Sequence, residues 1–401
     1  MKIMLRFSVL IGVFVTVVVL VLAQGSSDNE PVYPTTPDEI TEDGIMITNG
    51  LRHSVPLQDI IFDDFDIPSR SRPLSHATPD DIERLRDRIA PICNGEIAAC
   101  VPLDYEDVAA ADIWMGDNMN VMGYIATDGQ AYAYPFNILN FHEIVNDTLA
   151  GEPVLISYCP LCNSAVIYSR VLDGQELVFG NTSALYNSDM VMYDTATDSF
   201  WFQVEGSSVV GELTGAVLTP LPSITTTWGT WKTQHPDSLV LVRPRRSTNY
   251  SRNVFAGYED TINSGRFFFP VDAEIIGDTR LQAADTVLLI EIGEEAVAYP
   301  LQNLGDAATY DNIGGQEIVV LSLTSGSSGA AYQPITDDGT SVQLVYSDGT
   351  WRDTNTDSTF NLSGQAVTGD LEGQTLLPIA ARYTYWFAAV ATAPHVVVYS
   401  S

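Results

Sequence analysis

An internal repeat limits the fold of this chain more than any other feature of its sequence. Residues 131–135, Ala-Tyr-Ala-Tyr-Pro, return as Ala-Val-Ala-Tyr-Pro at residues 296–300. The stretch Asp-Thr-x-Thr-Asp-Ser at residues 194–199 returns at 353–358, and the glycines and leucines that follow it recur at constant spacing. So many matches in the same order predict a tandem duplication of one domain.

Both copies, which we place at residues 116–243 and 283–400, alternate short apolar runs with Gly, Asp and Asn turns. In one example, Val-Ile-Tyr at 166–168 is followed by the turn Asp-Gly at 173–174. This spacing is typical of strands joined by tight turns. Helical periodicity is scarce, and residues 136–145 are the best helix candidate. The sequence therefore predicts a mainly β (β-rich α+β) fold, in which a barrel- or sandwich-like domain with few short helices occurs twice.

Residues 1–23 have the order of charged and apolar residues that is typical of a secretory signal. Lys2 and Arg6 precede an apolar run, and Val21 and Ala23 fit the −3 and −1 positions of a cleavage site. An uncleaved N-terminal anchor is the alternative. Either outcome predicts a secreted or cell-surface, extracytoplasmic protein that meets a membrane only through this segment.

The charge of the chain is strongly acidic. It has 51 Asp and Glu against 18 Lys and Arg, which gives a net charge of −33. Such a surface repels phosphate backbones, so the composition argues against nucleic acid as a partner. The sequence points to no particular partner or substrate.

Two segments outside the copies are predicted to be a leader and a connector. Residues 24–45 are rich in Gly, Ser, Pro, Thr and acidic residues, which is typical of a flexible acidic leader. Residues 244–282 join the copies and contain the aromatic run Phe267-Phe268-Phe269. A connector packed between domains explains that run more simply than a binding site.

Residues 46–115 predict an irregular N-terminal segment with one helix. Thr78 is a suitable N-cap for this helix, and Asp81 stands where a capping box has its acid. Cys93 and Cys100 follow the helix. In an oxidising compartment they predict a structural disulfide that closes a loop, with metal binding as the alternative.

The two copies serve as an internal control, because residues that they share belong to the common scaffold. In the alignment of the two copies, Cys159 and Cys162 of the first copy correspond to Thr324 and Ser327 of the second. His142 is also absent from the second copy, which has Ala-Ala where the first has His-Glu. The second copy lacks both the two cysteines and the histidine, which predicts a functional site in the first copy alone.

A Cys-x-x-Cys pair first suggests redox chemistry. Two thiols in one turn can cycle between dithiol and disulfide. On this hypothesis the chain is a thiol oxidoreductase in which Cys159 attacks, Cys162 resolves, and His142 acts as base or thiolate stabiliser. An inert disulfide between the two cysteines is the structural alternative.

Two further hypotheses remain open. Two thiolates at this spacing can hold one soft metal ion. Cys159, Cys162 and His142 would then bind copper or zinc, with Met190 or Met192 as an additional copper ligand. Alternatively, the duplicated β scaffold is a non-catalytic extracellular binding protein, and the cysteines have no chemical role.

The motifs of the first copy run in the order Tyr134-Pro135, His142-Glu143-Ile144-Val145-Asn146-Asp147, Tyr158-Cys159-Pro160-Leu161-Cys162-Asn163-Ser164, Leu185-Tyr186-Asn187-Ser188, Met192-Tyr193-Asp194, Trp201-Phe202-Gln203 and Trp228 to Trp231. This ordered set resembles the DUF3179 family of domains of unknown function. The resemblance covers most of residues 115–242 and is weak in the second copy. Some members are described as selenoproteins with selenocysteine at the Cys-Pro-Leu-Cys motif. The resemblance therefore implies redox work at Cys159 or Cys162.

Overall fold

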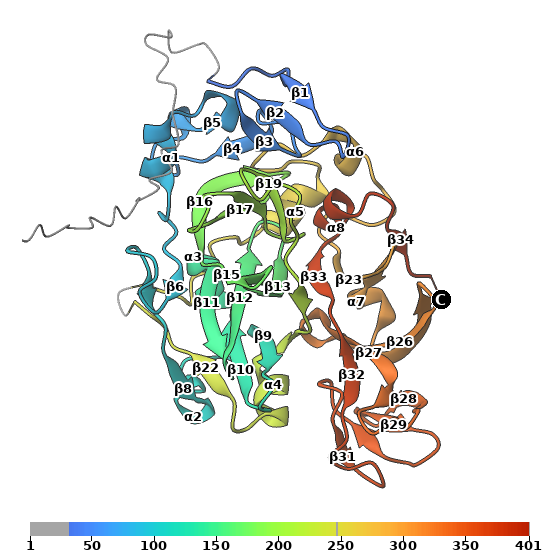
Figure 1. Ribbon diagram of the computed structural model, residues 1–401. Coiled ribbons are helices and arrows are strands. Elements are labelled where there is room, and N and C mark those ends of the chain that lie inside the picture. Colours follow the sequence, from blue (N-terminus) through green and yellow to red (C-terminus); the bar gives the residue numbers. More distant parts are fainter. Residues whose placement is uncertain (1–31, 246–247, 401) are drawn as a thin grey trace, which may run out of the picture.

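The strand-rich pattern of the sequence gives three large sheets and two small ones in the computed structural model, which describes residues 32–245 and 248–400 (Figure 1). The mainly β class with few short helices is confirmed. The predicted signal or anchor, residues 1–23, lies outside the described residues. The longest helices in the described ranges have 7 residues, so none has the length and apolar character that a membrane crossing requires.

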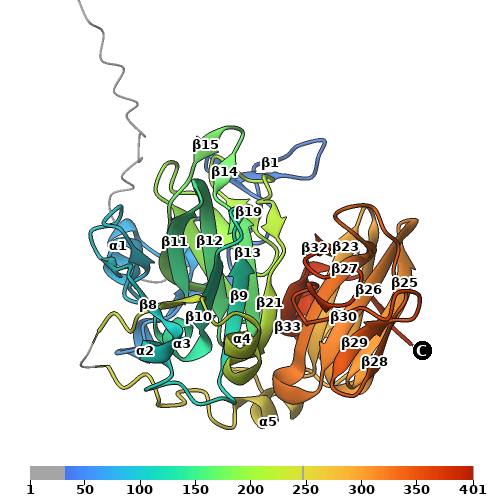
Figure 2. The same ribbon diagram turned by 90° about the horizontal axis from the view of Figure 1, so that it is seen from below.

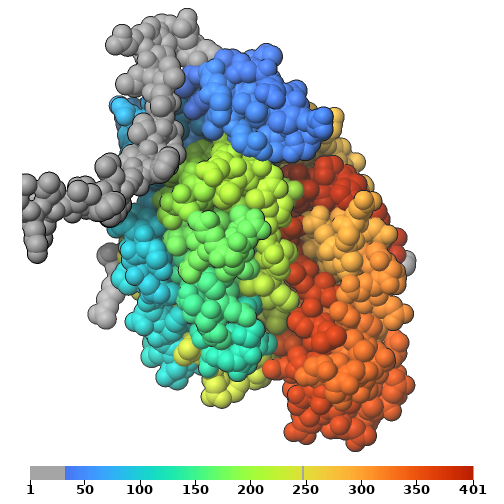
Figure 3. All heavy atoms as spheres, in the orientation of Figure 1, coloured from blue at the N-terminus to red at the C-terminus, as the bar shows by residue number. Residues whose placement is uncertain are grey.

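The N-terminal segment completes a sheet of the first half, the name used below for residues 116–243. Its strands flank β16–β19, and Figure 3 shows this segment, in blue, covering one end of the first half. Strand β1 lies within the predicted leader 24–45, so that part of the leader is paired strand. The strands in sheet order are β1 (Glu39–Ile40), β2 (Met46–Thr48), β3 (Leu51–His53), β19 (Ser207–Val210), β18 (Phe200–Phe202), β17 (Asp189–Asp194), β16 (Phe179–Tyr186), β4 (Ile60–Phe62) and β5 (Arg72–Pro73).

The other two large sheets, shared sheets one and two, each contain strands of the first half and of the second half, residues 283–400. Shared sheet one has the order β34 (Val397–Val398), β24 (Glu295–Pro300), β23 (Thr286–Ile292), β33 (Arg382–Tyr385), β13 (Ser164–Ser169), β12 (Glu152–Cys159), β11 (Ile144–Leu149), β6 (Ile92–Cys93) and β7 (Val101–Pro102), with β20 (Pro220–Leu221) beside β13. Shared sheet two has the order β25 (Ala307–Ile313), β26 (Gln316–Leu323), β27 (Ser328–Thr336), β21 (Ile224–Thr227), β9 (Asn120–Ile125), β10 (Ala131–Pro135), β22 (Leu239–Leu241) and β8 (Tyr105–Asp107), with β32 (Leu376–Ile379) beside β27.

The halves meet edge to edge at two reciprocal seams. The last long strand of the second half, β33, pairs with β13 at Ala165 and Tyr383. In shared sheet two, β21 of the first half pairs with β27 of the second half at Thr225 and Gly329. Figures 1 and 2 both show β33, in red, against the strands of the first half. The sheets therefore continue across the boundary between the halves.

Matching contacts recur in the two halves. The carboxyl of Asp194 accepts from the backbone N–H and the hydroxyl of Thr197, at 2.7 and 2.9 Å. The carboxyl of Asp353 accepts from the same two groups of Thr356, at 2.9 and 2.8 Å. These contacts are what a duplicated turn predicts; the duplication itself stays a prediction.

The remaining elements are short. Two small sheets consist of β14 (Val171–Leu172) with β15 (Gln175–Glu176), and of β28 (Leu344–Ser347), β29 (Thr350–Asp353), β30 (Thr359–Phe360) and β31 (Ala366–Thr368). The α-helices are α1 (Pro79–Leu85), α2 (Val108–Ala111), α3 (Phe136–His142), α4 (Trp228–Gln234), α5 (Tyr258–Asn263), α6 (Ala273–Ile276), α7 (Leu301–Leu304) and α8 (Trp386–Thr392). Single 3-10 turns are η1 (Pro68–Arg70), η2 (Leu74–His76) and η3 (Ser325–Ser327).

Two local predictions in the N-terminal segment are confirmed. Thr78 caps α1: its side chain accepts from the Asp81 N–H at 3.2 Å, and the Asp81 carboxyl accepts from the Thr78 N–H at 3.1 Å. Cys93 and Cys100 form a disulfide with their Cα atoms 5.6 Å apart. This bond settles the alternative in favour of the structural disulfide.

Candidate functional site

The two remaining cysteines occupy the tip of a hairpin in shared sheet one. Cys159 ends β12 and pairs with Ser164 at the start of β13, so the loop of residues 160–163 closes the hairpin. The second half holds this loop in place. The carbonyl of Cys162 accepts from the Tyr385 N–H at 2.8 Å and from the Thr384 hydroxyl at 3.2 Å.

Both cysteines are free thiols and both are buried. Cys162 Sγ donates to Asp189 Oδ1 at 2.8 Å, and the other carboxyl oxygen accepts from the Val204 N–H at 2.9 Å. One oxygen of Asp189 and the sulfurs of Cys159 and Cys162 lie within 4.8 Å of one another. Asp189 lies outside the Cys-Pro-Leu-Cys motif, and no feature of the sequence singles it out.

A tight hairpin turn brings Asp189 to the sulfurs. Asp189 begins β17, opposite Tyr186 at the end of β16. The turn residues Asn187 and Ser188 have φ of 48° and 61°, the left-handed values that a two-residue hairpin turn requires. The Asn187 side chain accepts from the Asp272 N–H at 2.9 Å, which anchors the turn to the connector.

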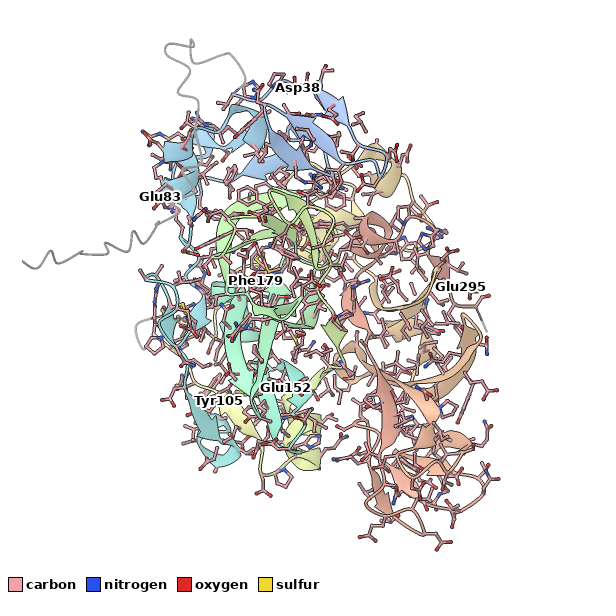
Figure 4. The ribbon with its side chains drawn as sticks, in the orientation of Figure 1. Asp38, Glu83, Tyr105, Glu152, Phe179 and Glu295 are labelled. Carbon is pink, nitrogen blue, oxygen red and sulfur yellow. A yellow bond between two sulfur atoms is a disulfide. The ribbon has the colours of Figure 1, made fainter. Side chains whose placement is uncertain are left out.

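A pair of hydrogen bonds ties this hairpin to the sheet that carries the sulfurs. Asn146 on β11 accepts from the Phe179 N–H and donates to the Phe179 carbonyl, both at 2.8 Å. Figure 4 shows Phe179 in the middle of the first half. Its ring packs edge-on against Trp201, with ring centroids 5.6 Å apart. The position of Asp189 over the sulfurs is therefore fixed by buried contacts of neighbouring strands.

The environment of the sulfurs favours neutral thiols. Burial raises the pKa of Cys159 and raises that of Cys162 well above its ordinary value, and the nearby Asp189 adds to both shifts. Burial also raises the pKa of Asp189 to about 6, although its hydrogen bonds from Cys162 and Val204 oppose this. Asp189 is thus an ionised carboxylate at neutral pH that can take up a proton under mildly acidic conditions.

A second polar chain lies behind Cys162. Its sulfur is 3.1 Å from Ser164 Oγ, which donates to the Gln203 side-chain carbonyl. The Gln203 amide in turn donates to Ser157 Oγ at 2.8 Å, and Ser157 donates to the Val166 carbonyl at 3.0 Å. Because every member has a partner, this chain fixes the inner face of the sulfur site.

Cys159 differs from Cys162 in that it borders a cavity of about 550 Å³. Glu143 lies in the same wall, where the Asn181 amide donates to its carboxyl at 2.7 Å. Burial raises the pKa of Glu143 to about 8, so this carboxyl is mostly protonated at neutral pH. Asn181 reaches Glu143 from β16, beside an irregularity in the pairing with β17 between Asn181 and Ala184.

The structure does not bring His142 to the sulfurs, which corrects the roles predicted for it. Its Nδ1 lies 2.8 Å from the Ala90 carbonyl and its Nε2 lies 2.8 Å from the Tyr250 hydroxyl. A carbonyl only accepts, so Nδ1 carries the proton and Nε2 accepts from Tyr250. Burial lowers the pKa of His142 to about 4. This is a neutral structural histidine with both nitrogens occupied.

The helix that carries His142 also ends earlier than residues 136–145 suggest. Helix α3 stops at His142, and β11 begins at Ile144. Glu143 lies between them with φ of 58°, a left-handed conformation that ends the helix and is costly for a residue with a side chain. This conformation accompanies the placement of the Glu143 carboxyl in the cavity wall.

Of the two methionines predicted as copper ligands, Met190 lines the Cys159 cavity and accepts from the Asn181 amide at 3.3 Å. Met192 is fully buried in the apolar cluster that also contains both sulfurs. In the described part of the chain, the cluster of metal-ligating side chains at this site consists of Cys159, Cys162 and Asp189.

Comparison with known proteins gives one match. A family model described as protein of unknown function (DUF3179) matches residues 94–396, a range that contains the first half, nearly all of the second half, and Cys159, Cys162 and Asp189. No curated protein and no solved structure matches the chain.

Proposed function

Because the chain belongs to the DUF3179 family, whose function is unknown, we propose its function from the geometry of the sulfur site. We infer an exported thiol–disulfide oxidoreductase in which Cys159 attacks and Cys162 resolves. One observation carries this proposal: Cys159 borders a cavity, whereas Cys162 lies against the buried carboxyl of Asp189. An outer thiol that meets the substrate and an inner thiol with its own base are the two parts that the reaction needs.

The reaction has two steps. Cys159 Sγ attacks one sulfur of a substrate disulfide, and the other sulfur leaves as a thiolate. Cys162 then gives its proton to Asp189 and attacks Cys159 Sγ, so that a Cys159–Cys162 disulfide forms and the second substrate thiolate leaves. Two electrons pass to the substrate, and the protons of the two thiols neutralise the two leaving thiolates.

The charges around the sulfurs favour the reducing direction. Dithiol pairs with strongly lowered thiol pKa values are oxidants, because their reduced form is stabilised as a thiolate. Here burial and Asp189 raise the pKa of both thiols. The reduced pair gains no such stabilisation, which supports a pair that passes electrons to its substrate.

Trapping tests the order of the two sulfurs. With a small disulfide reagent, Cys162→Ser should accumulate a mixed disulfide at Cys159, and Cys159→Ser should not, because Cys162 lies away from the cavity. Mass spectrometry of the intact protein reads both outcomes. Equal modification of the two variants would contradict the assigned order.

The same reagent tests Asp189. Asp189→Asn should not slow the first step, because the Asp189 charge raises the pKa of Cys159. It should slow the second step roughly a hundredfold, because the inner thiol loses its base. Asp311→Asn, which removes a carboxyl hydrogen-bonded to Tyr299 at 2.7 Å in the second half, is the matched control. A reduction potential below about −300 mV without measurable exchange would mark the pair as a structural bridge.

The three-residue cluster favours a metal site as the second candidate. Ligands of a tetrahedral zinc ion stand about 3.8 Å apart, and the sulfurs of Cys159 and Cys162 and the carboxyl of Asp189 already lie within 4.8 Å of one another. Asp189 replaces His142 in this ligand set. On this alternative, protein purified without added metal should carry zinc or copper, and Asp189→Ala should lose it while His142→Ala keeps it. Less than about a tenth of an equivalent in the unaltered protein would rule against the alternative.

Export is proposed on two grounds. The sequence of residues 1–23 predicts a signal or an anchor, and the Cys93–Cys100 disulfide fits an oxidising compartment. Fractionation of cells that produce the full chain tests this. Recovery of the protein in the cytoplasm with Cys93 and Cys100 reduced would contradict it.

A further inference from the structure

The cavity at Cys159 is built by three parts of the chain that lie far apart in sequence. The sulfur loop forms its floor together with α3 and the β16–β17 hairpin, and the N-terminal segment and the connector complete its wall. The lining residues are Asp63, Phe65, Ile89, Asn140, Glu143, Cys159, Pro160, Leu161, Asn181, Ser183, Ala184, Leu185, Met190, Val254, Phe255, Phe268 and Phe269.

Most of this wall is apolar, and large apolar side chains extend to its rim. Phe65 and Phe268 are 51% and 60% exposed although both line the cavity. Phe268 belongs to the aromatic run that the sequence assigned to connector packing. Aromatic side chains that remain exposed around a reactive group are typical of a ligand site.

The described wall of the cavity carries no positively charged group. Among the described residues that line the cavity there is no Arg, Lys or His, and the ionisable oxygens belong to Asp63 and Glu143. Arg88, the sequence neighbour of the lining residue Ile89, is already paired with Asp64 and Asp66. An anionic ligand would find no counter-charge here and would face a chain of net charge −33.

We propose that this cavity takes a small, uncharged disulfide with an apolar or aromatic body, which the Cys159 thiol reduces. The proposal rests on the exchange function above and adds the class of substrate. A volume of about 550 Å³ is suited to a small molecule rather than to the loop of a folded protein. The Asn181 amide and the Glu143 carboxyl supply one polar corner. Burial keeps the pKa of Glu143 at about 8, so this corner is mainly uncharged at neutral pH.

Two aryl disulfides of similar size and different charge can show whether the cavity selects an uncharged substrate. 4,4′-Dithiodipyridine is neutral, and 5,5′-dithiobis(2-nitrobenzoate) carries two carboxylates. Each releases two light-absorbing thiol products for every Cys159–Cys162 disulfide that forms. Because the same Cys159 thiolate attacks both reagents, its pKa cancels in the ratio of the two rates. Full-length reduced protein should favour the neutral reagent by a ratio about tenfold larger than the same protein unfolded in urea.

A charge placed at the rim tests the cavity directly. Phe268→Lys should speed the reaction of the anionic reagent and reduce the ratio severalfold, whereas Phe268→Gln, which removes the ring without adding charge, should not. Val397→Lys adds the same charge at a residue of the second half that is 60% exposed and should leave the ratio unchanged. Phe268 is mostly exposed, so its variants should fold.

The outcomes separate the two proposals. If both reagents form the Cys159–Cys162 disulfide but the folded and unfolded ratios are equal, the substrate class is wrong and the exchange function stands. If Phe268→Lys and Val397→Lys change the ratio equally, the selectivity comes from the net charge of the chain and the cavity proposal is overturned. If neither reagent oxidises the folded protein, both proposals fall.

Discussion

Glu143 is the residue whose protonation should be easiest to detect in the folded protein. Burial raises its pKa to about 8, so the folded state holds a proton that the unfolded state has released. For such a group the stabilising effect is complete below the unfolded pKa and is lost as pH rises through the folded pKa. From pH 6.5 to 8 the contribution of Glu143 to the free energy of unfolding should fall by about 1–2 kcal/mol.

Glu143→Gln should remove most of that fall. Urea unfolding at several pH values measures it, with the exposed residue Glu372→Gln as control. His142 and His235, whose pKa values burial lowers to about 4, are neutral in the folded protein over this window and still partly protonated near pH 6.5 when unfolded. Their effect on stability has the opposite sign and is the same in the variant and the unaltered protein, so the comparison removes it. A variant that loses stability over pH 6.5–8 as steeply as the unaltered protein would show that Glu143 does not carry the effect.

At the residue scale, the sequence predicted the site residues that belong to recognisable motifs. It did not predict residues that only the folded chain brings to the site. The cysteine pairs stand out by their spacing, and Thr78 with Asp81 by the capping pattern. Asp189 has no such mark, because it reaches Cys162 across a separate hairpin, 27 residues further along the chain. The contrast with the second copy did single out the pair His142-Glu143, but it could not tell that the carboxyl, and not the imidazole, lies in the cavity wall.

The strand β9 depends on one glycine for its fit against α4. A Cβ added at Gly123 would lie 2.0 Å from the Trp231 ring, which is fully buried. Gly123→Ala should therefore cost about 3 kcal/mol or more, because neither the strand nor the ring has room to move. Gly116→Ala is the matched control, since a Cβ there meets nothing within 4 Å.

Thermal unfolding of the two variants tests this contact. We expect a clear decrease in Tm for Gly123→Ala and little change for Gly116→Ala. Similar Tm values for both would contradict the close packing of Trp231 on β9.

At the element scale, local sequence patterns predict the strands and short helices. They do not predict which strands pair with each other. The Val-, Ile- and Tyr-rich runs predicted the strands, and the glycine and Asn/Asp turns predicted their ends. The pairing of β33 with β13 and of β21 with β27 joins residues more than a hundred positions apart, and no local signal encodes it. The connector was underestimated for the same reason: Val254, Phe255 and Phe268 enclose Cys159 only in the folded molecule.

The molecule as a whole should not divide into two independent domains. Shared sheets one and two both run through the boundary between the halves, and one apolar cluster contains the two sulfurs together with Trp386 and Phe387. Residues 283–400 expressed alone would expose the edges of β27 and β33 and part of this cluster. We expect this fragment to aggregate or to lack a cooperative unfolding transition.

Circular dichroism and size-exclusion chromatography of the fragment test this expectation. As a control, the full chain is cleaved after folding at a protease site placed in the exposed turn at residues 264–266. The two pieces should then remain associated, because the seams and the core are intact. A separate second half that unfolds cooperatively would contradict the shared architecture.

The hydrogen bonds from Thr384 and Tyr385 to the Cys162 carbonyl also have a consequence for biosynthesis. Thr384 lies 222 residues after Cys162, so the ribosome adds strand β33 long after it adds the two cysteines. A nascent chain that ends before this strand carries an unsupported sulfur loop, open to oxidation and to pairing with Cys93 or Cys100. We therefore expect chains that end before this strand to form mispaired disulfides when they meet an oxidant.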